Sequence, residues 1–568
     1  MLPRIFWHIH IVDTNELIFR HCQRSVKLII RLMTKKIRRA EGKPMDAVIV
    51  AGLSKSRGSQ FSVKKEYLLT RNGMIMSYGN LQKLFGLSSS FDFENFTTPY
   101  LAGIYLYNYL TRRGISCGLI NFLDLEEKEF EKLLNQDPKV IALSTTFLTN
   151  IKAVKNVTRK IRCRAPGIKI ILGGPLVYNS YLLFRLKDSV YDTDSCASDY
   201  FFLNREKEYY EDIDLFVIED QGEKTLFQVV TAIINRQDYL ETPNIAFYKD
   251  DNLVITDKIA ENNDFSDDLI YWDEMPEEFI FPVFPVRGSR GCPFKCKYCN
   301  FSPGRSFHLK SPDSISKEIA ALADTGKVKM IRFTDDNLFF DRRHLEDCCR
   351  KIIEIGKGIK WTSFIRADSI TKENIKLLRD SGCVLAQIGM ESGDRKILKE
   401  MNKKSSPENY LKAIALLNSH GISTQLYFII GFPGETPQSI ERTIEMINRF
   451  YNQGPAINEL MVFPFQFAPL SPIYDPDNAI KYSLKGYMNQ WTHYTMDSEQ
   501  AGAYAIDFID KVEDVYPHYG IEELLMVEMA KLKEISRLRH KIFRAQKSKA
   551  SKRETEQYWQ ELKKAVTA

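Results

Sequence analysis

Two series of short apolar runs, separated by segments with helical periodicity, follow one another along the chain. The first series starts at Met45 and reaches about residue 235; its apolar runs are MDAVIVAGL, SCGLINFL, KVIALSTTF, IKIILGGPLV and IDLFVI. Buried strands that alternate with helices are typical of a parallel, doubly wound sheet. Residues 45–245 are therefore predicted to form an α/β domain of this kind. Residues 179–212 interrupt the pattern and are predicted to be an insertion.

The second series lies between residues 282 and 465. Its strands are predicted near FPVRGS, KMIRF, IKWTSFI, VLAQIG, STQLYFII and INELMVF, with amphipathic helices between them. Six strand–helix repeats predict a complete or partial β/α barrel of the TIM type, whose chemistry belongs at the carboxyl ends of the strands. Residues 246–281 are then a connector. Residues 466–568 are predicted to be a mainly helical C-terminal region that faces the substrate.

The positive charge of the chain is confined to its N-terminal end. The formal net charge is +6, and residues 1–44 hold ten Lys and Arg against three Asp and Glu. The remainder is close to neutral, which gives no footprint for a nucleic acid. No run of about 20 apolar residues is present that could span a membrane. The segment 25–39 is either a basic amphipathic helix on a membrane surface or part of a solvated extension, and a start at Met45 is a further alternative.

Three of the ten cysteines lie close together in the sequence RGCPFKCKYCN. A structural zinc site uses four ligands, whereas Cys292, Cys296 and Cys299 offer three thiolates. Three thiolates suit a 4Fe–4S cluster in which one iron stays free to bind a substrate. The alternative is a zinc site completed by His308, at a spacing that is unusual for zinc. The other seven cysteines show no regular pairing, which indicates a reducing compartment such as the cytoplasm.

The Cys-x3-Cys-x2-Cys spacing, with an aromatic Tyr298 before the third cysteine, resembles the signature of the radical S-adenosylmethionine (SAM) superfamily. The resemblance covers roughly residues 282–465. It implies a 4Fe–4S cluster held by the three cysteines, SAM at the open iron, and an electron donor such as flavodoxin or ferredoxin. Reductive cleavage of SAM would then give a 5′-deoxyadenosyl radical that removes hydrogen from the substrate. The protein's share would be to position the reactants and exclude water.

The resemblance also implies SAM contacts at the ends of later strands. FTDDN offers acceptors for the SAM amino group or, alternatively, a cap for a helix near Arg342. IGMESG offers a carboxylate for the ribose hydroxyls or a cap, and IIGFPGET offers a turn against adenine. The candidate SAM residues are Tyr298, Thr334, Asp335, Asp336, Glu391, Ser392, Gly431 and Pro433. Lys403 is expected at the solvated surface, with the SAM carboxylate as its alternative partner, and Arg366 is a further candidate for the pocket.

Residues 46–235 resemble the cobalamin-binding domain of one radical SAM subclass, which has a Rossmann- or flavodoxin-like fold. The candidate cobalamin residues are Ser144, Thr145, Gly173, Gly174, Gly222 and Glu223. Many such domains ligate cobalt through the histidine of an Asp-x-His-x-x-Gly motif, but this chain has no histidine between His21 and His308. Cobalamin would therefore bind without a histidine lower ligand from this domain. The alternatives are local loop hydrogen bonds for the hydroxyl residues and a domain that holds no cofactor.

Together the two resemblances imply cobalamin-dependent methyl transfer to an unactivated carbon or phosphorus of a small-molecule or peptide substrate. Ring formation, rearrangement or oxidative cyclisation is the first alternative. A methylthiotransferase-like RNA modifier would need further cluster cysteines, but Cys117, Cys163 and Cys196 are widely spread. A zinc-stapled binding protein is the remaining alternative. QWTHYTM is expected near the substrate entrance, where His493 is either an acid–base group or a buried histidine.

Overall fold

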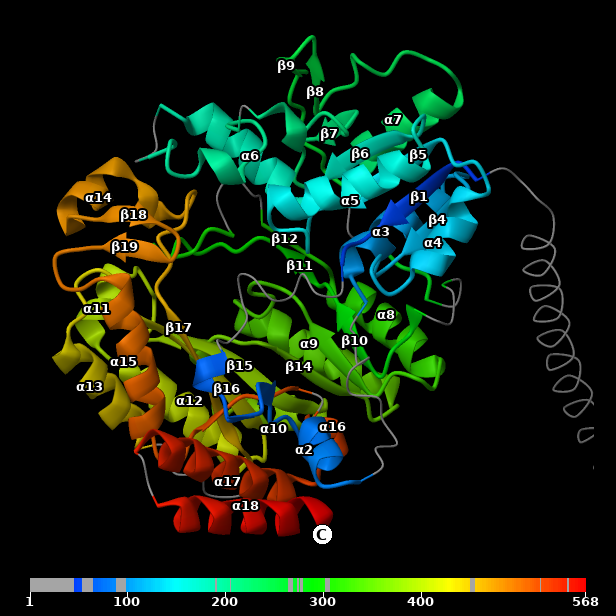
Figure 1. Ribbon diagram of the computed structural model, residues 1–568. Helices are drawn as coiled ribbons and strands as arrows, with labels where there is room; N and C mark the ends of the chain where they lie inside the picture. Colours follow the sequence, from blue (N-terminus) through cyan, green and yellow to red (C-terminus); the bar gives the residue numbers. More distant parts are fainter. Residues whose placement is uncertain are drawn as a thin grey trace, which may run out of the picture.

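The computed structural model describes most of the chain beyond residue 44. The described residues are 45–53, 65–87, 99–188, 192–204, 206–263, 269–272, 275, 279–301, 307–449, 455–521, 523–548 and 551–568. The basic extension expected at residues 1–44, with its segment 25–39, lies outside them. Figure 1 shows a front domain stacked on a core domain, with the C-terminal region along one side of both.

The front domain contains a seven-stranded sheet. In sheet order its strands are β4 (Cys117–Ile120), β1 (Ala47–Val50), β5 (Val140–Ser144), β6 (Lys169–Gly173), β7 (Leu215–Val217), β8 (Ile245–Lys249) and β9 (Asn252–Ile255). The first five strands are parallel, and β8 and β9 add an antiparallel edge. The predicted doubly wound sheet is confirmed. Its last two strands reach into the segment that the sequence pattern assigns to a connector from residue 246.

The helices of the front domain are α3 (Leu101–Thr111), α4 (Glu127–Leu134), α5 (Ile151–Arg164), α6 (Pro175–Leu186) and α7 (Glu223–Ile234). The sequence pattern does not reveal α6, because its second half lies within the segment taken as an insertion. Gly174 has a positive φ and Pro175 stands at the first helical position, so the glycine turn starts this helix directly. The described residues between α6 and Asp212 include short 3₁₀ helices at Ala197–Asp199 and Lys207–Tyr209.

The core domain is built on a second seven-stranded sheet, in which every pair is parallel. In order, its strands are β10 (Val283–Val286), β13 (Met330–Phe333), β14 (Lys360–Phe364), β15 (Cys383–Glu391), β16 (Ser423–Ile430), β17 (Asn458–Pro464) and β20 (Tyr516–Pro517). Its helices are α8 (Pro312–Asp324), α9 (Arg342–Ile355), α10 (Ile375–Asp380), α11 (Arg395–Glu400), α12 (Pro407–Ser419) and α13 (Pro437–Ile447). Among the described strands, β10 and β20 are its two edges, so the predicted barrel is partial.

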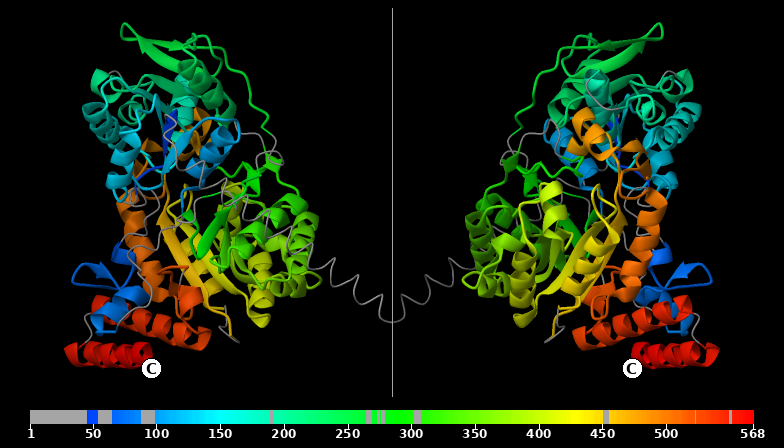
Figure 2. Two further views of the ribbon diagram at one scale, coloured as in Figure 1. Left: turned by 90° about the vertical axis from the view of Figure 1, so that its right-hand side faces the viewer. Right: turned by 90° about the vertical axis from the view of Figure 1, so that its left-hand side faces the viewer.

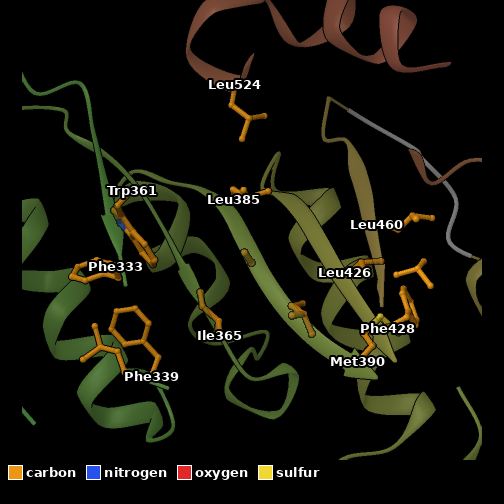
Figure 3. Packing of buried hydrophobic residues seen from close by; sticks show 14 of the residues in the cluster. Phe333, Phe339, Trp361, Ile365, Leu385, Met390, Leu426, Phe428, Leu460 and Leu524 are labelled. Carbon is orange, nitrogen blue, oxygen red and sulfur yellow. The ribbon is translucent and has the colours of Figure 1, made fainter. Parts of the chain in front are cut away.

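Alternate residues of the core strands face the helices and form the largest hydrophobic cluster (Figure 3). Met390 on β15 and Phe428 on β16 belong to it, and the ring of Trp361 lies edge-to-face against Phe333, 5.9 Å between centroids. In a strand, successive side chains point to opposite faces. The residues between these positions are therefore left to line the inside of the partial barrel.

The C-terminal region is mainly helical, as predicted. It contains α14 (Pro476–Tyr482), the hairpin β18 (Lys485–Tyr487) and β19 (Gln490–Thr492), α15 (Ser498–Lys511), α16 (Glu523–Met526), α17 (Met529–Lys547) and α18 (Lys552–Thr567). A small N-terminal unit of β2 (Thr70–Arg71), β3 (Met74–Ile75) and α2 (Tyr78–Leu84) lies beside these helices in every view (Figures 1 and 2). Its backbone donates to the Tyr519 hydroxyl and to Glu523. Searching the described residues finds no helix with the length and apolar character to span a bilayer.

Candidate active site

A cavity of about 1510 Å³ lies between the front domain and the partial barrel. The carboxyl ends of β5 and β6 form one wall, and the three-cysteine nest with the ends of the core strands forms the other. The predicted site residues that line it are Ser144, Thr145, Gly173, Gly174, Gly222, Glu223, Cys292, Cys296, Tyr298, Cys299, Thr334, Asp335, Asp336 and Glu391. Ser392, Gly431 and Pro433 do not line it.

The loop that carries the nest is fastened to the segment after α11. The Lys297 amide donates to the Met401 carbonyl (2.9 Å), and the Asn402 side chain donates to the Lys295 carbonyl (2.7 Å). The three cysteines are free thiols, partly exposed to the cavity. The side-chain amide of Asn337 lies 3.7 Å from the sulfur of Cys292 and donates to it. The nest is thus a set of three sulfur ligands on an anchored loop.

The structure also bears on two alternatives: a zinc site completed by His308, and further cluster cysteines in the front domain. Among the described residues, no three His, Cys, Asp or Glu side chains are grouped so that they could hold a single metal ion. His308 belongs to the short strand β12 (His308–Leu309), where it is the register partner of Arg290 on β11 (Ser289–Arg290). Cys117, Cys163 and Cys196 lie on β4, on α5 and just before a 3₁₀ helix.

Glu391 forms a buried polar cluster with Tyr298 and Lys403. The Tyr298 hydroxyl donates to Glu391 Oε1 at 2.8 Å, and Lys403 Nζ donates to the same oxygen at 2.9 Å. The side chains of Glu391 and Lys403 are only 9% and 14% exposed. Burial alone would lower the pKa of Lys403, but Glu391, Tyr410 and Cys296 together outweigh it, so the pKa is raised. The expectation of a solvated Lys403 is wrong, because this lysine lines the cavity beside the nest.

The backbone around Glu391 explains the sequence GMESG. A Cβ on Gly389 would stand 2.5 Å from Glu391 Oε1 and 3.0 Å from Lys403 Nζ. Glu391 itself has a φ of +65°, at a shift in the register between β15 and β16. The Ser392 hydroxyl accepts from the Asp394 amide and lies 3.4 Å from the Thr443 hydroxyl. Of the two predicted ribose ligands, only Glu391 faces the cavity.

The FTDDN segment divides its acidic residues between two positions. Asp335 is buried and accepts hydrogen bonds from the backbone of Gly288 and Ser289, so it fastens the strand end that leads to the nest. Burial raises the pKa of Asp335 to about 6, although these backbone donors oppose the shift. Thr334 and Asp336 are exposed to the cavity. The helix cap expected from this segment is supplied by Asp341 instead.

The turn after β16 is closed off from the cavity. Gly431 has a φ of +91°, and a Cβ there would meet Ala501 at 2.6 Å and Trp491 at 2.8 Å. Its carbonyl accepts from His493 Nε2 at 3.0 Å, and the imidazole stacks on Trp491. Burial lowers the pKa of His493. His493 is therefore a buried, hydrogen-bonded histidine, and its proposed acid–base role at the entrance is not supported by its position.

Arg366 lines the cavity but is engaged with the protein. Its guanidinium forms two hydrogen bonds with Asp368 and stacks over the ring of Phe294 at 4.0 Å. Phe294 lies between the first two cysteines of the nest. Arg366 thus packs against the nest loop.

In the front domain, Thr145 braces the glycine turn after β6. Its hydroxyl donates to the Gly173 carbonyl at 2.8 Å and accepts from the Leu176 amide. A Cβ on Gly174, whose φ is +101°, would stand 3.0 Å from that hydroxyl. The Ser144 hydroxyl lies 3.1 Å from that of Thr146. The local hydrogen bonds that are the alternative role of Ser144 and Thr145 are thus present. The turn at Gly173 and Gly174 nevertheless lines the cavity.

Glu223 joins the two domains. It follows Gly222, the left-handed residue at the start of α7, and its carboxylate accepts from Arg290 of the core domain at 2.7 Å. Both side chains are largely buried. Glu223 is thus already paired within the protein.

Sequence reasoning passed over Asn337 and the polar strand residues Gln387 and Gln425. All three line the cavity. A polar side chain inside an otherwise apolar, buried strand, as in VLAQIG and STQLYFII, is the signal that marks the two glutamines.

Residues 286–447 match the family model described as the radical SAM superfamily. This part of the chain is a radical SAM domain. Among solved structures, the chain resembles the radical SAM methyltransferase TsrM of Kitasatospora setae with cobalamin and a [4Fe–4S] cluster bound. The TM-score is 0.51 at 15% identity, over 66% of this chain and 74% of TsrM. This likeness shows a shared fold over about two thirds of the chain.

Two curated relatives extend the comparison. An uncharacterized methyltransferase of Pyrococcus horikoshii is 25% identical over 325 residues, which are 54% of this chain and 70% of the relative. The anaerobic magnesium-protoporphyrin IX monomethyl ester cyclase of Cereibacter sphaeroides is 26% identical over 366 residues, which are 61% of this chain and 54% of the cyclase. The chain thus spans about half the length of the cyclase.

Proposed function

We propose that this chain is a cobalamin-dependent radical SAM enzyme that transfers a methyl group to an unactivated carbon or phosphorus of a small-molecule or peptide substrate. The observation that carries the proposal is the cavity in which the nest of a radical SAM domain faces the glycine turns of the front sheet. Its volume of about 1510 Å³ exceeds the roughly 300–1,000 Å³ of pockets for one drug-sized ligand. Methyltransferases among the relatives and the cobalamin in TsrM support the same reading.

The residues at the nest fit a cluster and SAM. Cys292, Cys296 and Cys299 would hold the cluster, and the Asn337 amide suits a cluster sulfur. Asp336 and the Glu391–Lys403 pair place both signs of charge beside the nest, which suits the ammonium and carboxylate of SAM. When bound, the reduced cluster supplies the electron that cleaves SAM, and cobalamin carries the methyl group. The chain itself holds, orients and shields these groups.

The front wall fits cobalamin through its backbone rather than through a metal ligand. The turn at Gly173 and Gly174 has no side chains, so its main chain could approach a large ligand closely, and at Gly174 a Cβ would also crowd Thr145. The front domain contains no histidine. The front domain would therefore hold cobalamin without supplying a histidine ligand to it.

The chemistry requires an electron donor such as flavodoxin or ferredoxin and a reducing compartment. The nine cysteines of the described residues are all free thiols, which supports the cytoplasm as that compartment.

Anaerobic reconstitution of the full chain with iron and sulfide tests the cluster. We expect about four irons per chain, an EPR signal on reduction, and loss of both in Cys→Ala variants at the three nest positions. The matched control is Cys163→Ala, because Cys163 is exposed on α5. Bound zinc, or iron that survives the nest substitutions, would contradict the proposal.

Product analysis tests the reaction. With cobalamin, SAM, a strong reductant and substrate, methyl transfer predicts 5′-deoxyadenosine and S-adenosylhomocysteine together. Formation of 5′-deoxyadenosine alone would instead favour the ring-forming or cyclising alternative. Absence of SAM cleavage from a cluster-loaded protein would refute both.

A further inference from the structure

A row of side chains on the inner face of the partial barrel is not used by the groups assigned above. Phe364 on β14 pairs in register with Gln387 on β15, and Gln387 pairs with Gln425 on β16. Tyr427, two residues further along β16, pairs with Met461 on β17. All five line the cavity. The row therefore forms part of the cavity wall on the inner face of the barrel.

The hydrogen-bonding groups of Gln387, Gln425 and Tyr427 are only partly used by contacts among these three side chains. Gln387 Nε2 donates to Gln425 Oε1 and to the Tyr427 hydroxyl (2.8 Å), which in turn donates to Gln425 Oε1 (2.9 Å). Gln387 Oε1 has no hydrogen-bond partner among the described residues, although the residue is only 2% exposed. Gln425 Nε2 contacts the Met461 thioether, which is a weak acceptor. One strong acceptor and one poorly used donor remain on adjacent strands.

The surroundings of this pair are aromatic. The rings of Phe364 and Tyr427 lie 5.0 Å apart, and those of Tyr427 and Phe463 are parallel at 6.3 Å. The neighbouring Glu459 accepts a hydrogen bond from His518 Nδ1 at 2.7 Å, so its carboxylate is already engaged within the protein. Arg332 of β13 also lines the cavity and would favour an anion. A carboxylate, however, has acceptors only and would leave Gln387 Oε1 without a donor.

We propose that Gln387 and Gln425 recognise the substrate through a carboxamide or lactam edge, whose N–H donates to Gln387 Oε1 and whose C=O accepts from Gln425 Nε2. A trans peptide group points its N–H and C=O in opposite directions. A primary carboxamide or a lactam presents both on one edge and fits the adjacent pair. The apolar body of the substrate then lies against Phe364 and Phe463. This inference rests on the proposed function only in taking the barrel interior as the substrate site.

Binding of matched fragments to the reconstituted full chain, without reductant, tests the inference. Isoindolin-1-one carries the lactam edge on an aromatic body, and phthalide replaces its N–H by an oxygen. A site built to hydrogen-bond a substrate rejects the analogue that lacks the donor, so we expect calorimetry or ligand-observed NMR to show about tenfold weaker binding of phthalide. Benzoate should bind more weakly than the lactam.

Variants separate this site from nonspecific binding. Gln387→Met should abolish the preference for the lactam, whereas the control Gln560→Met, on the exposed face of α18, should keep it. Equal affinity for lactam and lactone, tighter binding of benzoate, or an unchanged preference in Gln387→Met would overturn the inference. If Gln387→Met does not fold, the comparison on the unaltered chain still decides. Because no SAM cleavage is needed, these outcomes are independent of the tests of the proposed function.

Discussion

Single side chains set the environment of the nest, and Asn337 does so most directly. Its amide donates to the sulfur of Cys292 at 3.7 Å from a buried position. Hydrogen bonds to the sulfurs are among the factors that set the reduction potential of an iron–sulfur cluster. We expect Asn337→Leu to lower the midpoint potential of the reconstituted cluster by on the order of tens of millivolts. EPR-monitored redox titration measures this, with Asn478→Leu on α14 as control. An identical potential in both variants would show that the contact has no electronic role.

Also at the residue scale, position 389 requires a glycine because of the side chains beside it, not because of its backbone conformation. A Cβ would collide with Glu391 Oε1 and Lys403 Nζ, whereas a Cβ on Gly502 of α15 would meet nothing within 4 Å. Overpacking costs about 1–3 kcal/mol, so Gly389→Ala should lower the melting temperature. Gly502→Ala should raise it slightly, because alanine is favoured in a helix by up to about 1 kcal/mol. Thermal melts that move in the same direction would contradict this account.

At the scale of elements, the turn between β16 and α13 contains a buried acid. Glu435 accepts from the Gly431 amide at 2.6 Å, and burial raises its pKa to about 8. An unfolded glutamate has a pKa of about 4.3. Between these values the folded state keeps a proton that the unfolded state releases, so stability falls as pH rises, by about 1.4 kcal/mol per pH unit. Above pH 8 the loss levels off.

Glu435→Gln stays neutral and removes this contribution. Its melting temperature relative to the unaltered protein should therefore increase steadily from pH 5 to pH 8. His493, which packs on the same turn, is present in both proteins and cancels in the comparison. Glu556→Gln, on the exposed surface of α18, is the control. If the melting temperatures of Glu435→Gln and the unaltered protein change with pH in the same way across this range, Glu435 ionises normally.

The strands and helices of both sheets could be predicted because parallel strands buried on both faces read as apolar runs. The nest could be predicted because its ligands are neighbours in sequence. Lys403 and Asp335 could not be placed, since their partners, Glu391 and the Gly288 backbone, are brought to them by the fold. The start of α6 could not be predicted because Pro175, Leu176 and Val177 read as the end of the apolar run IKIILGGPLV.

Contacts between segments that lie far apart in the sequence could not be predicted from the sequence pattern either. The N-terminal unit that contains α2 packs on the C-terminal helices, and Leu69 and Tyr519, joined by a hydrogen bond, are 450 positions apart. β20 adds an edge to the core sheet with only two residues. Neither segment is long enough to show periodicity. Such contacts depend on the whole tertiary structure rather than on local sequence.

At the scale of the molecule, the cavity depends on how the front domain is held against the core. Lys310 of the core is fully buried between Glu318 (2.9 Å) and the Tyr105 hydroxyl of α3 (3.3 Å). The second link is the pair Glu223–Arg290, whose side chains are 7% and 11% exposed. One buried ion pair and one hydrogen bond from a buried lysine thus cross this interface and hold the domains in register, which keeps the nest opposite the glycine turns.

Glu223→Gln tests this link, because it keeps the shape of the side chain and removes its charge. Removing one partner of a buried pair costs on the order of 3–5 kcal/mol, so we expect faster limited proteolysis between the domains and faster hydrogen exchange in α7. Glu131→Gln is the matched control: its pair with Arg164 lies within the front domain and is exposed, and such pairs contribute less than about 1 kcal/mol. If both variants are cleaved at the rate of the unaltered protein, the interface does not depend on this pair, and the register of the two domains must be set by apolar contacts and Lys310 instead.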